Sequence, residues 1–316
     1  LTRRAGTRHS QGVGRRGRGA EARHMRIPRL LPLAVLAALV LPAAPTGSAA
    51  TAPAVPTLVG IQAARHPGFD RVVFEFRGGL PASRRVRYVD RLLADASGLP
   101  VRIAGRAVLR VRFEAARAHD ARGSTVPGRT AFALPDVMTT VRAGDFESVT
   151  TYGIGLARRT RVHVFTLRHP SRVVIDLRAA FPTVNRKVWF LDRNRFLANE
   201  PPFFTPRLRP VRPSTPGTGL MDRLFAGPLT PEKAGGLRLL RSGARGFSHL
   251  SITDGVARVR LTGGCTSHGS TVTIADEIKP TLRQLAAVRW VKIYDPAGHT
   301  ERPTGHSDSV PTCLEP

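Results

Sequence analysis

The fold is decided by the stretch at residues 66–76, which reads HPGFDRVVFEF. Within it Val72, Phe74 and Phe76 occupy every second position. Because successive side chains of a strand point to opposite faces, this spacing predicts a strand that turns one face toward a core.

The same two-residue period recurs through residues 58–181. It appears at residues 109–113, 162–165 and 172–177, and turn-forming residues separate these runs at 78–81, 97–100, 127–128 and 169–171. No amphipathic helical stretch of useful length occurs between them. Many short strands with frequent turns are typical of an all-β sandwich or barrel.

Residues 186–316 have a mixed pattern that predicts a smaller α+β domain. A strand at 188–192 is followed by a proline-interrupted stretch to Pro216, and a helix at 220–225 is ended by the Gly-Pro pair at 227–228. Thr230 is expected to cap a second short helix through its hydroxyl oxygen. A helical stripe at 274–285 is expected to kink or break at Pro280, before a last strand at 288–294.

Residues 249–262 are expected to form a hairpin around Asp254-Gly255, a pair that tolerates the positive φ of a tight turn. The expected register buries apolar residues on one face, namely Leu250, Ile252, Ala257, Val259 and Leu261. Arg258 and Arg260 then face outward, and a slip by one residue would bury both guanidinium groups.

The N-terminal part predicts export. Residues 25–49 read as a signal peptide, with Arg26 and Arg29 before an apolar stretch of about a dozen residues and cleavage expected near Ala49 or Ala52. An uncleaved anchor is the alternative, although a span needs about 20 apolar residues. Residues 1–24 are interpreted as an upstream extension from a misplaced start codon, with a basic nucleic-acid arm as the alternative, and residues 50–57 as a linker.

The charge balance favours a polyanionic partner. Residues 1–49 hold nine of the 49 basic and one of the 22 acidic residues, which leaves 40 basic and 21 acidic side chains and a net charge of +19. Only four of the basic residues are lysines, which a GC-rich coding bias explains. The net excess indicates acidic wall polymers or lipid headgroups. Arg110, Arg112, Arg258 and Arg260 are candidate contacts, with a solvated strand face as the alternative.

Two resemblances give these domains an expected function. Residues 66–76, Tyr88-Val89-Asp90, and the runs at 144–147 and 151–156 resemble the AMIN-like domain of secreted actinobacterial proteins. The resemblance implies a non-catalytic β-sandwich related to modules that bind envelope components such as peptidoglycan. It fixes no ligand-contacting residue.

Residues 224–228, 255–261, 291–295 and 308–316 resemble the GerMN domain of sporulation and germination proteins. That resemblance implies assembly or scaffolding. One such domain accompanies a sensor kinase in a lipoprotein, and this chain departs from it by lacking an anchoring cysteine and a propeller.

The only two cysteines, Cys265 and Cys313, are expected to form a disulfide in an oxidising compartment. A zinc site is the alternative, because Cys265 and His268 have ligand-like spacing and His299 and His306 follow. The run Ser267-His268-Gly269 resembles part of the L,D-transpeptidase motif, but Ser270 stands where that motif has its nucleophilic cysteine. No other catalytic motif or cofactor-binding loop is present, so no cofactor, no metal and no enzymatic activity are expected.

The sequence therefore predicts a secreted, cell-wall-associated protein that binds peptidoglycan or an acidic wall polymer through its first domain and makes protein contacts through its second. A regulatory accessory of a membrane sensor kinase or wall enzyme is the alternative, and a wall hydrolase or transpeptidase acting through His268 or Ser270 is a third possibility. Nucleic-acid binding fits the charge, but no motif supports it and export opposes it.

Overall fold

The computed structural model of the protein describes residues 54–316, all of which belong to one compact unit. The predicted signal peptide at 25–49, the upstream residues 1–24 and residues 50–53 of the predicted linker lie outside the described residues. The division of the remainder into two separate domains stays a prediction. Residues 57–178 are called the sandwich below, and residues 184–314 the C-terminal region.

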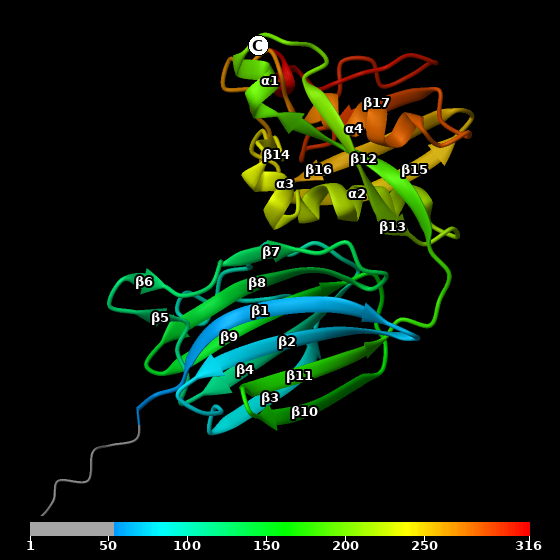
Figure 1. The fold of residues 1–316 in the computed structure, drawn as a ribbon. Coiled ribbons are helices and arrows are strands. Elements are labelled where there is room, and N and C mark those ends of the chain that lie inside the picture. Colours follow the sequence, from blue (N-terminus) through cyan, green and yellow to red (C-terminus); the bar gives the residue numbers. More distant parts are fainter. Residues whose placement is uncertain (1–53) are drawn as a thin grey trace, which may run out of the picture. The chain divides into compact units, whose positions relative to one another are not determined.

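Two antiparallel sheets make the sandwich (Figure 1). The first has the order β1 (Thr57–His66), β2 (Phe69–Arg77), β11 (Ser171–Arg178) and β10 (Val162–Arg168). The second has the order β3 (Ser83–Val89), β4 (Ala107–Glu114), β9 (Val149–Leu156), β8 (Val137–Phe146) and β7 (Arg129–Ala131). A two-stranded ribbon pairs β5 (His119–Asp120) with β6 (Gly123–Ser124). The predicted all-β sandwich is confirmed.

The core of the sandwich is built by the residues that showed the two-residue period. Phe74 of β2 lies 5.1 Å from Phe113 of β4 and 5.9 Å from Tyr152 of β9, measured between ring centroids, and all three rings are fully buried. Burial of each such side chain contributes about 1.5–3 kcal/mol. The alternating pattern therefore forms strands because one face of each sheet is packed against the other sheet.

The C-terminal region is α+β, as predicted. One sheet has the order β13 (Phe204–Val211), β12 (Val184–Asp192) and β14 (Leu237–Arg238), and the other has β15 (Gly246–Thr253), β16 (Val256–Thr262) and β17 (Trp290–Tyr294). The helices are α1 (Arg193–Leu197), α2 (Pro216–Ala226), α3 (Thr230–Ala234), α4 (Ile274–Arg283) and the 3-10 turn η1 (Thr312–Leu314). Strands β16 and β17 run parallel, and the other strand pairs in these two sheets are antiparallel.

The hairpin register is confirmed, since Leu250 pairs with Val259 and Ile252 with Ala257 around a turn in which Asp254 and Gly255 have φ of 53° and 77°. The proline-interrupted stretch contains strand β13, which the sequence pattern does not predict. Prolines are tolerated there because β13 lies at the edge of its sheet, where not every amide has to donate to a neighbouring strand.

Two helix details differ from the expectation. Helix α3 begins at Thr230 itself, and Glu232 caps it by accepting a 2.7 Å hydrogen bond from the Leu229 amide, so the predicted Thr230 cap is wrong. Helix α4 continues through Pro280 to Arg283, so of the predicted kink or break the break is wrong, and a kink stays a prediction. Burial of Ile278 and Leu282 on either side of Pro280 holds that helix together.

A buried arginine joins α2 to the sandwich. The guanidinium of Arg223 donates to the carbonyl oxygens of Phe132 at 3.0 Å and of Pro135 at 3.2 Å, and also to those of Leu134 and Val137. Its Nε donates to the Pro210 carbonyl at 3.0 Å. The preceding residue, Asp222, accepts two hydrogen bonds from Arg106 of the sandwich, at 2.8 and 2.9 Å. These contacts are internal to the compact unit and satisfy a charge that would otherwise be costly to bury.

Two buried carboxyl groups lie near this arginine. Asp70 Oδ2 accepts hydrogen bonds from the amides of Asp136 and Val137, at 2.7 and 3.0 Å, and Asp136 Oδ1 accepts one from the Arg158 amide at 3.0 Å. The other oxygen of each carboxyl group has no hydrogen-bond partner among the described residues. Burial, reinforced by the charge of Asp70, raises the pKa of Asp136 to about 7, and burial also raises the pKa of Asp70.

This pair makes stability depend on pH. An aspartate whose pKa is higher in the folded state holds its proton longer there, so the free energy of unfolding falls as pH rises from about 4 to about 7, by up to about 1.4 kcal/mol per pH unit. We expect Asp136→Asn to remove part of this slope. Urea denaturation at pH 5 and pH 8 measures how much the free energy of unfolding falls between these two pH values. An equal fall in the natural protein and in the variant would contradict the assignment of the pH dependence to Asp136.

Candidate binding face

An arginine-rich face covers the two neighbouring strands β3 and β4. Their antiparallel register places Arg85 directly opposite Arg112, and Arg87 directly opposite Arg110. These four residues define the arginine face. Of these four, Arg110 and Arg112 are predicted from the sequence, and the structure adds their partners from β3.

The orientation of the face follows from strand geometry. Leu109, Val111 and Phe113 alternate with the two arginines of β4 and are buried in the sandwich core. Val86 and Tyr88 of β3 pack against the same core. The arginines therefore point to the opposite side of the sheet, where they line a hollow of about 190 Å³ together with Glu114.

The arginine face carries more positive than negative charge. Arg110 lies 2.6 Å from Asp95, and Arg112 lies 3.3 Å from Glu114. Among the described residues, no carboxylate lies within ion-pair distance of Arg85 or Arg87. Hydrogen bonds from Ser83 and Arg112, with the nearby charge of Arg85, hold the pKa of the Glu114 carboxyl below its usual range, which keeps it ionised at neutral pH.

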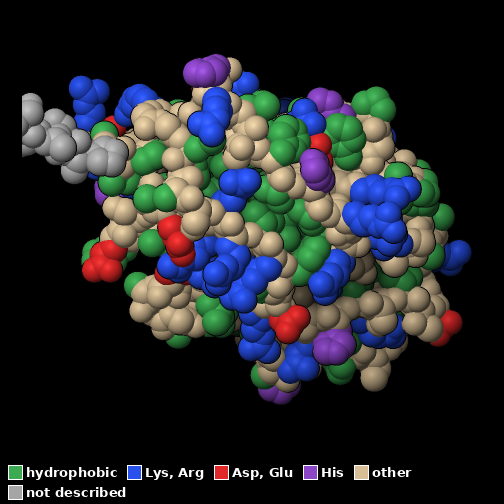
Figure 2. Space-filling model, turned by 90° about the horizontal axis from the view of Figure 1, so that it is seen from below, with side chains coloured by type: hydrophobic (Ala, Val, Ile, Leu, Met, Phe, Trp, Pro, Cys, Tyr) green, Lys and Arg blue, Asp and Glu red, His purple; other side chains and the backbone are tan. Residues whose placement is uncertain are grey.

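This arrangement is unfavourable for the sheet alone. Like charges placed directly opposite each other on neighbouring strands destabilise the pair, and here two such pairs follow each other on one face. An anionic ligand would remove that repulsion. On the side of the molecule shown in Figure 2, Lys and Arg side chains gather in several clusters with few acidic side chains among them.

Comparison with known families agrees with this fold. Residues 56–179 match the AMIN-like domain. This chain contains an AMIN-like domain. No curated protein and no solved structure matches the chain. The arginine face belongs to the AMIN-like domain, whereas the GerMN resemblance of residues 186–316 stays a prediction.

The other two candidate arginines lie on a different sheet. Arg258 and Arg260 both belong to β16, which is central in the sheet β15-β16-β17. Arg260 Nε donates to the Pro296 carbonyl at 3.1 Å, and its Nη2 donates to the same oxygen at 2.6 Å. Arg260 therefore holds the loop after β17, and the structure does not bring this pair together with the arginines of the AMIN-like domain.

Arg85 and Arg87 could have been found from the sequence. Residues 83–89 read SRRVRYV, in which these arginines alternate with Val86 and Tyr88 as in a half-buried strand. What the sequence could not give was the pairing partner, because strand order and register are set by the whole sandwich.

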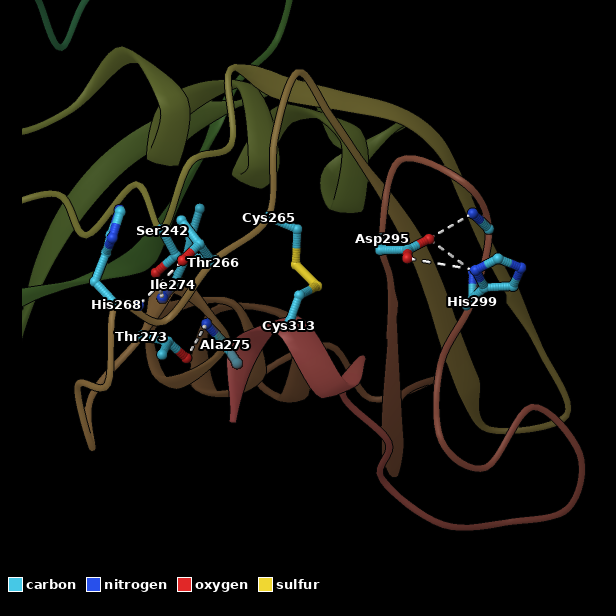
Figure 3. The surroundings of a disulfide bond; sticks show 11 residues. Ser242, Cys265, Thr266, His268, Thr273, Ile274, Ala275, Asp295, His299 and Cys313 are labelled. Atoms are coloured by element: carbon cyan, nitrogen blue, oxygen red, sulfur yellow. Dashed lines mark hydrogen bonds and ion pairs between the residues drawn. A yellow bond between two sulfur atoms is a disulfide. The ribbon is translucent and has the colours of Figure 1, made fainter. Parts of the chain in front are cut away.

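The predicted disulfide is present between Cys265 and Cys313, with a Cα–Cα distance of 5.7 Å. It joins the loop after β16 to the turn η1 (Figure 3). Since both thiols are used in this bond, the zinc alternative is wrong. Figure 3 also shows His268 and His299 on opposite sides of the disulfide, with His299 beside Asp295.

The residues of the transpeptidase-like run have local structural roles. The Ser270 hydroxyl donates a 2.8 Å hydrogen bond to the Val272 carbonyl, and the His268 amide donates to Thr266 Oγ1 at 3.1 Å. His268 is exposed and has a φ of 53°, which fits a turn. With Cys265 oxidised, this segment holds no thiolate nucleophile. In the described part of the chain, none of the helices has the length and apolar character needed to cross a bilayer.

Proposed function

We propose that this protein is an exported, non-catalytic component of the bacterial cell envelope that binds cell-wall material through the arginine face of its AMIN-like domain. The observation that carries the proposal is the two pairs of directly opposed arginines on β3 and β4, an arrangement that costs stability and that an anion would stabilise. Guanidinium groups pair with carboxylate or phosphate in a planar, bidentate geometry.

Export is supported by two independent features. The first is the signal-like sequence at residues 25–49. The second is the disulfide, a bond that persists in oxidising compartments and is rare in the cytosol. A location in contact with the cell wall places the net positive charge next to carboxylates of peptidoglycan stem peptides and to acidic wall polymers.

Replacing Arg85 and Arg87 by threonine tests the proposal. Neither guanidinium has an ion-pair partner among the described residues, so the variant orphans no carboxylate. Exposed charge contacts contribute about 0.2–1 kcal/mol each, and we therefore expect retention on insoluble purified walls to weaken several-fold at low salt. Co-sedimentation of residues 50–316 with walls, measured at two salt concentrations, gives the retention.

Stability should move in the opposite direction. Threonine favours strands, and the change removes both like-charged pairs, so the free energy of unfolding should stay equal or rise. Arg122→Thr with Arg193→Thr is the matched control, because both residues are exposed and the net charge changes equally. If both double variants lose the same amount of retention, wall binding depends only on overall charge. That result would contradict binding through the arginine face.

Retention on walls treated with acid, which removes phosphodiester-linked polymers, distinguishes between the two candidate wall ligands. Retention that survives the treatment identifies peptidoglycan, and retention that disappears identifies an acidic polymer. For residues 186–316 we propose contacts with an envelope protein, as the GerMN resemblance implies. Capture of a membrane protein without wall retention would favour the accessory role instead.

A further inference from the structure

A second group of arginines, distinct from the arginine face, lines a cavity that is partly open to solvent. The cavity has a volume of about 90 Å³, and five arginines line it, namely Arg102, Arg106, Arg129, Arg241 and Arg245. Three of them come from the AMIN-like domain and two from the C-terminal region, so both parts of the compact unit build its walls. A water molecule needs about 10–15 Å³ of such volume, which leaves room for a small ion.

One of the five arginines is neutralised within the protein. Arg106 forms a bidentate ion pair with Asp222, and its guanidinium lies 4.6 Å from the ring centroid of Phe247. Among the described residues, no carboxylate lies within ion-pair distance of the other four. The cavity therefore has a strong excess of positive charge.

The positive charges influence one another. Burial, and then the charges of Arg241 and Arg102, lower the pKa of Arg129 to about 10. Burial and the charge of Arg102 lower the pKa of Arg241, although Glu277 partly offsets this. Arg129 also lowers the pKa of Lys233, after burial. With a pKa of about 10, Arg129 stays charged at neutral pH, and the folded protein keeps it beside other cationic side chains that repel it.

Hydrogen bonds within the described part of the protein do not explain why these arginines lie together. Arg129 donates to the Arg102 carbonyl, which fixes the position of its guanidinium. The guanidinium groups of Arg102, Arg241 and Arg245 make no hydrogen bond to any described residue. Their positive charge is thus available to an anionic ligand.

We propose that this cavity binds a small tetrahedral oxyanion, namely a phosphate group, either free or as a phosphomonoester. Arg102, Arg129 and Arg241 are its principal ligands, because guanidinium groups recognise phosphate oxygens through paired N–H donors. The site is separate from wall binding and does not depend on it. Because Arg102 and Arg129 precede β12 and Arg241 follows β14, a bound phosphate would also tie the AMIN-like domain to the C-terminal region.

Isothermal titration calorimetry on residues 50–316 tests this proposal at constant ionic strength, with inorganic phosphate in one arm and glycerol phosphate in the other. We expect saturable binding in at least one arm, which identifies the free or the ester form. Arg102→Gln with Arg241→Gln should weaken it at least tenfold. Arg122→Gln with Arg193→Gln is the matched control and should bind as the natural protein does.

The variant is chosen so that it folds. Neither replaced guanidinium donates a hydrogen bond to a described residue, and the change removes mutual repulsion. The unfolding temperature of the variant without phosphate should therefore be unchanged or higher. Phosphate should raise the unfolding temperature of the natural protein and not that of the variant. Absence of saturable binding in both arms, or equal affinity in the cavity variant and the control, would overturn the proposal.

Discussion

Replacing Arg223 by alanine is expected to lower the free energy of unfolding by about 3–5 kcal/mol, the range for breaking a buried, fully hydrogen-bonded charge. The side chain is 1% exposed and donates to five carbonyl oxygens, four of them in residues 132–137 of the AMIN-like domain. Alanine removes the donor of all five hydrogen bonds and opens a cavity beside α2.

The place in the chain where amide protection is lost distinguishes the hydrogen bonds of Arg223 from ordinary core packing. Leu224→Ala, at the next residue of α2, also creates a cavity in a fully buried site, but a leucine side chain donates no hydrogen bond to those carbonyls, and the change should cost about 2–5 kcal/mol. Amide hydrogen exchange should show faster exchange of the Phe132 amide, which is bonded to the Met138 carbonyl, in the Arg223 variant only. Equal protection of that amide in both variants would contradict the assignment.

Arg223→Lys provides a graded comparison. A lysine keeps the charge but has one ammonium group, which cannot serve carbonyl oxygens on both sides as the guanidinium fork does. We therefore expect stability between those of the natural protein and the alanine variant. A lysine variant as stable as the natural protein would show that charge alone is sufficient here.

Replacing both Cys265 and Cys313 by serine is expected to lower the free energy of unfolding by about 4 kcal/mol. The two cysteines are 48 residues apart, and in the chain-entropy description a closed loop of that length restricts the unfolded chain by roughly this amount. The disulfide also holds η1 and the irregular segment after β17, which has few buried apolar side chains.

Urea denaturation with and without reductant measures this effect. Reductant should destabilise the natural protein to the level of the serine variant and leave the variant unchanged. Exchange should rise most in residues 295–316, because their strongest link to the loop after β16 is lost. A natural protein that is indifferent to reductant under unfolding conditions would contradict a stabilising disulfide.

Local pattern predicted part of the strands, and it did not predict their partners. The two-residue period identified β2, β4, β10 and β11, and the Asp254-Gly255 turn fixed the register of its hairpin, because these signals depend only on neighbours in the chain. Strand β13 was missed, since Pro206 and Pro210 argue against a strand unless it lies at an edge. Edge position is a property of the whole sheet.

The charged sites show the same limit. Arg110 and Arg112 were identified as outward-facing, but the opposed Arg85 and Arg87 depend on the pairing of β3 with β4. Arg223 was part of an expected amphipathic helix, and nothing in the sequence indicates that its charge is buried against residues 132–137. Long-range contacts of this kind are set by packing between elements distant in sequence.

Protection of arginines from a dicarbonyl reagent is the most direct test of the wall-binding face. Residues 50–316 are treated with phenylglyoxal in the presence and absence of solubilised wall material, and modification is located by mass spectrometry. The proposal predicts that Arg85, Arg87, Arg110 and Arg112 lose reactivity when wall material is bound, while Arg122 and Arg193 remain as reactive as before. Unchanged reactivity of the four, with protection confined to other arginines, would contradict it.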